Sequence, residues 1–295
     1  MRFATVLAGS FACLAACAGS PSGEPDWMAR LPDTQLLSQL SIPGTHDSGA
    51  MYEPYPGIAQ AQHLTIAEQL AAGIRYLDLR CRDVDDQFFI YHGAIDQNQT
   101  FDEALATLYT FLDAHPHELV IASVKEEAVA SGATIPFDQV LARYVAAAPD
   151  RWALAPHLPV LGDARGKLVL VRRFATTGAP LGIDATAWAD NASFSIQSSD
   201  AMLRIEDNYM VSDNDAKWAA ITANLAAVGD PAVLFLTYTS GYQMVSGLPD
   251  ITLVSDDIDA RLDAWLAANP AAQTGVLVTD FATEARTAAI VATNR

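Results

Sequence analysis

Positively charged side chains are scarce in this sequence. Its 295 residues include 17 Lys and Arg against 35 Asp and Glu, which gives a formal net charge of −18 at pH 7. Proteins that bind nucleic acid usually carry a basic face, and none is evident here. The same charge argues against simple electrostatic attraction to an anionic membrane. We therefore expect no nucleic acid among the partners.

Cysteine is rare as well, and long apolar runs are few. The chain has three cysteines, Cys13, Cys17 and Cys81. The apolar run 3–16 follows Arg2 and is too short to span a bilayer, so residues 1–16 are predicted to be an export signal. Removing this segment takes one positive charge away and changes the net charge from −18 to −19. Cys81 is then the only free thiol expected, which excludes an internal disulfide and a zinc cluster.

The residues around Cys17 predict how the mature chain begins. Leu14-Ala15-Ala16-Cys17 resembles the lipobox of bacterial lipoproteins, in which the cysteine is acylated and becomes the new N-terminus. Residues 17–30 then form a tether rich in small residues, and 31–295 form one domain. We expect an exported lipoprotein of the cell envelope, anchored through Cys17 by its acyl chains. The alternative is ordinary cleavage after Ala18, which would give a secreted protein.

The remainder of the sequence alternates between predicted strands and helices. The predicted strands are 36–42, 74–79, 88–91, 119–124, 167–174, 203–211, 233–238 and 275–279. The predicted helices are 66–72, 101–114, 137–148, 215–228, 256–268 and 283–292. This alternation predicts an α/β fold, an irregular single-domain (β/α)8 barrel of the TIM type. The irregularity is expected at residues 81–87, because seven residues are too few for a helical crossover.

Polar side chains follow the predicted strand ends. They are His46, Asp47, Arg80, His92, Lys125, Glu127, Arg173, Asp207, Tyr209, Thr239, Ser240 and Asp280. Barrel enzymes build their active sites at this face, so these residues are expected to converge. Each also has a purely structural interpretation: Arg80 can pair with Asp78 or Asp83, Lys125 with Glu126, and Asp280 can cap the last helix.

Such a cluster favours chemistry on an anionic group. Several cations beside two histidines suit a phosphate, and a histidine pair suits one general base and one general acid. No phosphate-binding loop of the G-x-x-x-x-G-K-[ST] or G-x-G-x-x-G type occurs, so no nucleotide cofactor is expected. Asp83, Asp85 and Asp86 lack the glutamate of a calcium loop, and we interpret them as a solvated turn. His63, His115, His117 and His157 are interpreted as surface or capping residues.

Seven segments together carry a resemblance to a known family. They are 41–49 (Ser-Ile-Pro-Gly-Thr-His-Asp-Ser-Gly), 73–80, 91–93, 123–127, 162–174, 206–209 and 275–280. In this order the chain resembles bacterial phosphatidylinositol-specific phospholipase C, the X-domain group. The resemblance implies cleavage of phosphatidylinositol, or of glycosylated phosphatidylinositol anchors, to diacylglycerol and inositol 1,2-cyclic phosphate. It also implies action at a membrane surface, and we expect a monomer.

The resemblance implies a role for each residue of the reacting centre. His46 would be the general base, oriented by Asp280, and would take the proton of the inositol 2-hydroxyl. His92 would be the general acid on the diacylglycerol oxygen, supported by Asp47. Arg80 would stabilise charge on the phosphate. Calcium-dependent relatives carry a carboxylate at the place of Arg80, so no metal is expected.

The remaining strand-end residues would bind the inositol ring. The resemblance implies hydrogen bonds from Lys125, Glu127, Arg173 and Asp207 to ring hydroxyls, with Tyr209 stacked on the ring. Two alternatives stay open. A glycerophosphodiester phosphodiesterase is also a barrel with paired histidines, although it needs a metal, and a non-catalytic lipoprotein that binds inositol lipids would keep the same pocket.

The sequence departs from the family at two places. Secreted members carry exposed tryptophans near the barrel mouth, whereas the corresponding stretches 51–55 and 241–245 contain none. Tyr52, Tyr55, Tyr242 and Met244 are weaker substitutes there. Cys81 follows Arg80 where glycine is usual.

Overall fold

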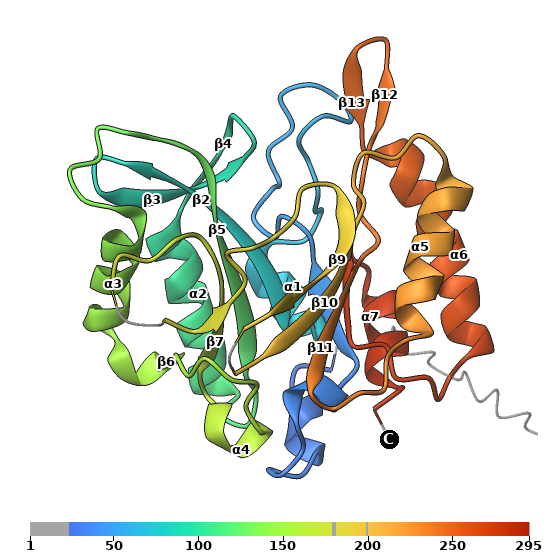
Figure 1. Cartoon of the computed structure of the whole chain (residues 1–295), viewed down its shortest axis with the longest axis horizontal. Coiled ribbons are helices and arrows are strands. Elements are labelled where there is room, and N and C mark those ends of the chain that lie inside the picture. The colour runs from blue at the N-terminus through green and yellow to red at the C-terminus, as the bar shows by residue number, and fades with distance from the viewer. Residues whose placement is uncertain (1–23, 179–180, 199, 295) are drawn as a thin grey trace, which may run out of the picture.

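The computed structural model describes residues 24–178, 181–198 and 200–294, and its centre is a strongly curved sheet (Figure 1). Seven parallel strands form most of it, in the order β7-β5-β2-β1-β14-β11-β10. They are β1 (Ile42–Thr45), β2 (Tyr76–Val84), β5 (Val120–Ser131), β7 (Leu168–Arg173), β10 (Met202–Asp207), β11 (Val233–Tyr238) and β14 (Val276–Thr279). Helices cover the outer face of this sheet (Figure 1). The predicted irregular barrel is confirmed.

The helices alternate with the strands along the chain. They are α1 (Ile66–Ala72), α2 (Phe101–Ala114), α3 (Phe137–Ala147), α4 (Leu161–Ala164), α5 (Asn214–Leu225), α6 (Thr252–Ala268) and α7 (Glu284–Val291). Three short 3-10 helices are η1 (Trp27–Arg30), η2 (Leu37–Gln39) and η3 (Pro149–Arg151). Both α1 and α2 begin with a capping box, Thr65 with Glu68 and Thr100 with Glu103, which fixes where each helix starts.

The barrel is open on one side. Short β6 (Trp152–Ala153) and β8 (Ile183–Asp184) pair parallel with β7, and β9 (Ala192–Gln197) pairs antiparallel with β10. No strand ladder among the described residues joins β6 or β8 to β9. The irregularity of the barrel therefore lies at this gap as well as after β2.

The first strand is not where the apolar run placed it. Residues 36–42 were predicted as a strand that Pro43 ends, but Leu37–Gln39 is a 3-10 helix and β1 runs through Pro43 and Gly44. Pro43 fits because β2 pairs with β1 only from Gly44 onward, so no ladder bond on that side needs its missing N–H. At Gly44 a Cβ atom would lie 2.9 Å from Cβ of Tyr76, so only glycine allows this close pairing.

The third predicted strand is not a barrel strand. Residues 88–91 lie in β3 (Gln87–His92), which turns back antiparallel on β2 and pairs with β4 (Ile95–Thr100). The turn between β2 and β3 uses Asp85 and Asp86 at positive φ, and Asp86 accepts the backbone N–H of Thr134. The hairpin replaces the crossover helix that the short connection could not form.

Side chains of the parallel strands alternate between two cores. Along β7, Val169 and Val171 belong to the cluster inside the barrel, whereas Leu168 and Leu170 belong to the cluster beneath α1, α2 and α3. A third cluster packs α5, α6 and α7 against the sheet around Leu277. Because these strands are covered on both faces, their side chains are buried in an unbroken row, which agrees with their continuous apolar sequences.

The N-terminal end of the barrel is closed by residues that precede the predicted domain. Trp27 and Met28 are 2% and 0% exposed, and Trp27 Nε1 donates to the Gly73 carbonyl. Glu118, paired with Arg75, accepts the backbone N–H groups of Met28 and Ala29. The folded body therefore includes residues 24–30, which the sequence assigned to the tether. The predicted signal segment and Cys17 lie outside the described residues.

Candidate active site

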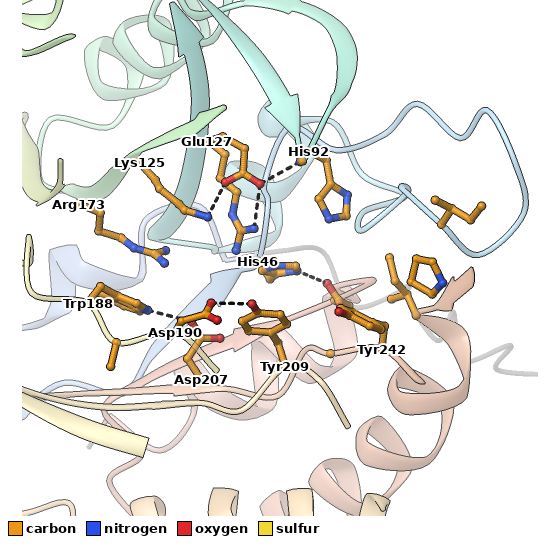
Figure 2. Close-up of a pocket in the computed structure, with 18 of the residues that line it drawn as sticks. His46, His92, Lys125, Glu127, Arg173, Trp188, Asp190, Asp207, Tyr209 and Tyr242 are labelled. Atoms are coloured by element: carbon orange, nitrogen blue, oxygen red, sulfur yellow. Dashed lines mark hydrogen bonds and ion pairs between the residues drawn. The ribbon is translucent and has the colours of Figure 1, made fainter. Parts of the chain in front are cut away.

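The carboxyl ends of the parallel strands surround a cavity of about 460 Å³ (Figure 2). Nine predicted site residues line it: His46, Arg80, His92, Lys125, Glu127, Arg173, Asp207, Tyr209 and Asp280. Asp47 does not line the cavity but lies directly behind it and is fully buried. Charged groups of both signs thus converge on one concave site, as in most enzyme active sites.

The turn after β1 sends His46 and Asp47 in different directions. Asp47 adopts a left-handed conformation with φ of 40°, and its backbone N–H lies 3.3 Å from Oδ2 of Asp78. Ser48 fixes the turn, since its hydroxyl accepts the N–H of Asp78 and donates to the Thr45 carbonyl. His46 therefore faces the cavity while the Asp47 carboxylate points beneath it.

His46 is held by a carboxylate at its inner nitrogen. Nδ1 of His46 lies 2.7 Å from Oδ1 of Asp280, which is 1% exposed. Burial lowers the pKa of His46, but Asp280 outweighs it and the net pKa is raised. With Nδ1 bonded to Asp280, Nε2 is the nitrogen left to exchange a proton within the cavity.

His92 reaches the cavity from the end of the antiparallel strand β3. Its Nδ1 lies 2.7 Å from the Ala59 carbonyl, and its Nε2 lies 3.8 Å from Oδ2 of Asp47. A carbonyl only accepts, so Nδ1 carries the proton and Nε2 faces the carboxylate. The His46 and His92 rings stand edge to face with centroids 6.1 Å apart. Two imidazoles with different partners therefore share one small space.

The buried Asp47 carboxylate lacks hydrogen-bond donors. Neither of its oxygens has a hydrogen-bond partner, and Arg80 Nε is 3.7 Å away. Burial raises the pKa of Asp47 to about 6, although His92 and Arg80 act in the opposite direction. This carboxyl group therefore titrates near neutral pH beside His92.

Arg80 is fixed by carboxylates on two strands. Its Nε donates to Oδ2 of Asp78 at 2.9 Å, and its NH1 lies 3.5 Å from Glu127. Glu127 also pairs with Lys125 at 2.5 Å and accepts the N–H of Gly93. Burial raises the pKa of Glu127, but Arg80 and Lys125 outweigh it and lower the pKa to about 2. Both cations thus stand in fixed places with donors free for an anion.

The next wall of the cavity holds Arg173 and Asp207 through a tryptophan that the sequence analysis missed. The guanidinium carbon of Arg173 lies 3.7 Å from the ring centroid of Trp188, and Trp188 Nε1 donates to Oδ2 of Asp207 at 2.9 Å. Trp188 lies between β8 and β9, where no strand was predicted, so no strand-end signal pointed to it.

Beside Asp207 the wall of the cavity is aromatic (Figure 2). Tyr209 donates its hydroxyl to Asp190 at 2.6 Å, and its ring lies 6.0 Å from the Tyr242 ring (Figure 2). Asp190 and Tyr242 line the cavity with it. No strand-end pattern in the sequence points to Asp190 or Trp188, and the sequence indicates only a membrane contact for Tyr242. An aromatic face beside carboxylates and cations suits a polyhydroxylated ring.

The structural interpretations of single residues are partly correct. Arg80 does pair with Asp78, yet it also lines the cavity. Lys125 pairs with Glu127 instead of Glu126, and Thr283 instead of Asp280 caps α7. Thr239 and Ser240 are buried and do not line the cavity.

The other histidines lie apart from the cavity. His63, His117 and His157 are exposed, and His115 pairs with Asp26. Across the described ranges, no group of three or more His, Cys, Asp or Glu side chains has the geometry to hold a metal ion.

Comparison with known proteins finds relatives of this chain. Residues 35–174 match the X domain of phosphatidylinositol-specific phospholipase C. The 1-phosphatidylinositol phosphodiesterase of Staphylococcus aureus strain Newman is 28% identical over 278 residues, which cover 87% of this chain and 88% of that protein. The Listeria monocytogenes protein of the same name is 35% identical over 160 residues, 49% of this chain and 47% of that one. Over residues 35–174 the chain is thus similar to the phosphatidylinositol-specific phospholipase C X-domain family.

Solved structures of relatives agree on the fold. Phosphatidylinositol-specific phospholipase C from Staphylococcus aureus superposes with a TM-score of 0.84 at 24% identity, covering 94% of this chain and 98% of that one. The Listeria monocytogenes enzyme superposes with a TM-score of 0.76 at 25% identity, covering 92% and 98%.

Proposed function

We propose that this protein cleaves phosphatidylinositol, or its glycosylated form, into diacylglycerol and inositol 1,2-cyclic phosphate. The observation that carries the proposal is the pair of histidines in one cavity, His46 on Asp280 and His92 on the Ala59 carbonyl, with Arg80 beside Asp47. The named relatives supply the substrate class, because they are phosphatidylinositol phosphodiesterases.

The reaction follows from the free nitrogens. Nε2 of His46 takes the proton of the inositol 2-hydroxyl, and that oxygen attacks phosphorus. The bond to the diacylglycerol oxygen breaks, and His92 Nε2–H donates the proton to it. Arg80 meets the charge that builds on the non-bridging oxygens. In this step His92 carries a proton on both nitrogens, with Nδ1–H on the Ala59 carbonyl and Nε2–H on the side of Asp47, whose Oδ2 lies 3.8 Å away.

The inositol ring occupies the wide part of the cavity. Lys125, Glu127, Arg173 and Asp207 hydrogen-bond its hydroxyls, and Tyr209 stacks on its face. These residues already have partners that hold them in place before the ring arrives, which limits the ordering cost of binding. Lys125 pairs with Glu127, and Asp78, Trp188 and Asp190 hold the other three.

The two segments that contribute Ile58 and Pro249 to the cavity wall also carry exposed apolar side chains, which we call the rim: Tyr52, Tyr55, Met244, Val245 and Leu248. Tyr55 is 68% and Met244 59% exposed. Met244, Val245 and Leu248 lie on the hairpin of β12 (Gln243–Val245) and β13 (Leu248–Asp250), which stands at the top of the barrel in Figure 1. We infer that the rim contacts the lipid surface and that the protein acts there as a monomer.

We also propose that the chain is a lipoprotein anchored through Cys17. No helix among the described residues is long and apolar enough to cross a bilayer. Glu24, the first described residue, has its carbonyl beside Gly73, where Trp27 also attaches at the barrel end opposite the cavity. The seven Cα-to-Cα steps from Cys17 to Glu24 reach at most about 25 Å. The 12 residues of β5 alone extend about 40 Å.

We infer that an anchor at Cys17 would attach at the end of the barrel away from the rim, and that so short a tether would not bring both to one surface. An anchored molecule turns its cavity away from its own membrane. It acts on lipid presented by another surface.

Phosphorus NMR of phosphatidylinositol vesicles incubated with the purified mature chain tests the proposed reaction. The expected result is a new cyclic phosphodiester resonance that grows as the substrate resonance declines. Release of a glycerophosphate, or no change in the spectrum while the protein binds the vesicles, would favour one of the alternative functions.

A further inference from the structure

The partner of His92 belongs to a surface loop. Residues 51–61 lie between β1 and α1, carry the exposed rings of Tyr52 and Tyr55, and end beside His92 (Figure 2). The Ala59 carbonyl of this loop accepts the Nδ1 proton of His92 at 2.7 Å. The position of one carbonyl thus decides which nitrogen of His92 faces the cavity.

One carboxylate organises the loop around that carbonyl. Oxygens of Glu53 lie 3.3 Å from the N–H of Tyr55, 3.3 Å from that of Ala59 and 3.0 Å from that of Gln60. Hydrogen bonds from backbone N–H groups to a carboxylate are stronger than those to a neutral acceptor. Glu53 therefore holds the peptide groups on both sides of Ala59 in one orientation.

The ends of the loop are attached independently of Glu53. Ala61 and Gln62 donate their N–H groups to the Ala50 carbonyl, and Ile251 donates to the carbonyl of Gly57. Gly57 has φ of 81°, a conformation that glycine adopts without strain. Loss of the Glu53 carboxylate should accordingly loosen the peptide at Ala59 without unfolding the loop.

We propose that Glu53 is a positioning residue for the general acid: it fixes the Ala59 carbonyl, which holds His92 with Nε2 toward Asp47 and the reacting phosphate. The proposal rests on the acid role of His92 in the proposed function. By this proposal, the loop that carries the rim tyrosines Tyr52 and Tyr55 also sets the orientation of the general acid.

Leaving-group chemistry separates this role from a structural one. Two water-soluble inositol phosphodiesters are compared, one with an alkanol leaving group and one with a nitrophenol. The alkanol needs a proton as it leaves, whereas the nitrophenolate does not, so only the first depends on a general acid. Soluble substrates also remove any effect of the loop on membrane binding.

The expected result for Glu53→Ala is a fall in kcat of about ten-fold or more on the alkanol substrate. KM should change little, and the nitrophenyl substrate should be cleaved at nearly the wild-type rate. Glu53→Gln keeps an acceptor oxygen, so its kcat on the alkanol substrate should lie between those of the wild type and Glu53→Ala. Gln60→Ala is the matched control, because its amide donates to the Gln62 carbonyl on the same loop. The NMR signal of the His92 Nδ1 proton should exchange faster with solvent in Glu53→Ala.

Equal losses on both substrates, or no loss on either, would overturn the positioning role. His92→Ala serves as the reference. If His92→Ala shows no preference for the nitrophenyl substrate, the acid assignment in the proposed function has failed. If His92→Ala shows the preference and Glu53→Ala does not, only the inference about Glu53 has failed.

Discussion

Nε of Arg80 lies 2.9 Å from Oδ2 of Asp78, two residues back on the same strand. Residues i and i+2 of a strand lie on one face, so β2 itself sets this pair. Asp78 also accepts from Arg173 at 3.1 Å. One buried carboxylate thus positions two guanidinium groups, one at the proposed phosphate and one at the proposed ring site.

Arg80 should be indispensable, and lysine should not replace it. A preorganised donor at the developing charge contributes on the order of 10²–10³ in kcat, and a lysine point charge cannot reproduce the planar fork. Both Arg80→Lys and Arg80→Ala should lose activity in that range. Turnover of phosphatidylinositol by each variant measures it.

The same reasoning predicts full activity in excess EDTA, because a fixed guanidinium stands where a cation would be needed. The turnover of Arg80→Asp is measured alongside, with and without added calcium. Abolition of wild-type turnover by EDTA and its recovery with calcium would contradict the arginine role.

The two histidines of the cavity should each be essential. His46→Ala and His92→Ala remove a proton-transfer group that contributes about 10²–10⁴-fold. His63→Ala and His157→Ala are the controls, since both side chains are exposed and outside the cavity. Comparable losses in the controls would show that the assignment is wrong.

Asp47→Asn should inactivate the enzyme yet stabilise the fold at neutral pH. Burial raises the Asp47 pKa from its usual 3.8 to about 6, so the folded state binds this proton more tightly than the unfolded state. Stability is then lost as pH rises from about 4 to 6, by about 3 kcal/mol in total. Asparagine does not ionise, so the Asp47→Asn variant does not lose this stability as the pH rises. Thermal unfolding should show equal Tm near pH 4 and a higher Tm for Asp47→Asn at pH 7.5.

Asp78→Asn is the matched control, because it should destabilise the fold at neutral pH whereas Asp47→Asn should stabilise it. Burial raises the pKa of Asp78, but Arg80 and Arg173 outweigh it and hold the pKa well below its usual value. This ionised carboxylate stabilises the fold at neutral pH, and its contribution is lost only in acid. Its neutralisation takes from two buried guanidinium groups the carboxylate that they share and should cost about 3–5 kcal/mol. A gain in stability for Asp78→Asn would contradict this electrostatic account.

The rim should govern access to vesicles but not chemistry. Burying an exposed apolar side chain contributes about 1.5 kcal/mol, so Tyr55→Ser and Met244→Ser should each weaken vesicle binding about ten-fold. Their kcat on a soluble inositol phosphodiester should be unchanged. Because the chain is strongly acidic, added salt should not weaken binding to anionic vesicles. A steep loss of binding with salt would reveal a basic docking face instead.

Anchoring is tested at the N-terminus. Mass spectrometry should find acylated Cys17, and Cys17→Ser should move the protein from the membrane to the soluble fraction. An unmodified chain starting at Gly19 would indicate ordinary cleavage. The anchored protein, reconstituted in vesicles, should cleave phosphatidylinositol in separate vesicles and spare its own. Inserting a long Gly-Ser segment before Glu24 should restore cleavage of the vesicle that carries it.

Several elements were predictable because local sequence suffices to define them. The helices 66–72 and 101–114 and the strand 233–238 coincide with α1, α2 and β11. Their signals are a capping box, apolar residues at helical spacing and a continuous buried run, and each acts within a few residues. The strand at 36–42 was wrong because pairing with β14 and β2, a long-range effect, selects Ile42–Thr45.

The sequence by itself determined the barrel and which polar residues follow strand ends. A parallel strand between helices fixes its own direction, so the side chain after it lies at the common face. Only the tertiary structure decided how those residues are partnered. Trp188 and Asp190 enter the site from an irregular connection, and Glu53 reaches His92 through a backbone carbonyl of a loop. Burial raises the pKa of both Asp47 and Asp78, but the cations closer to Asp78 outweigh burial there, so the two net pKa shifts have opposite signs. Such contacts join residues far apart in sequence, and no local pattern encodes them.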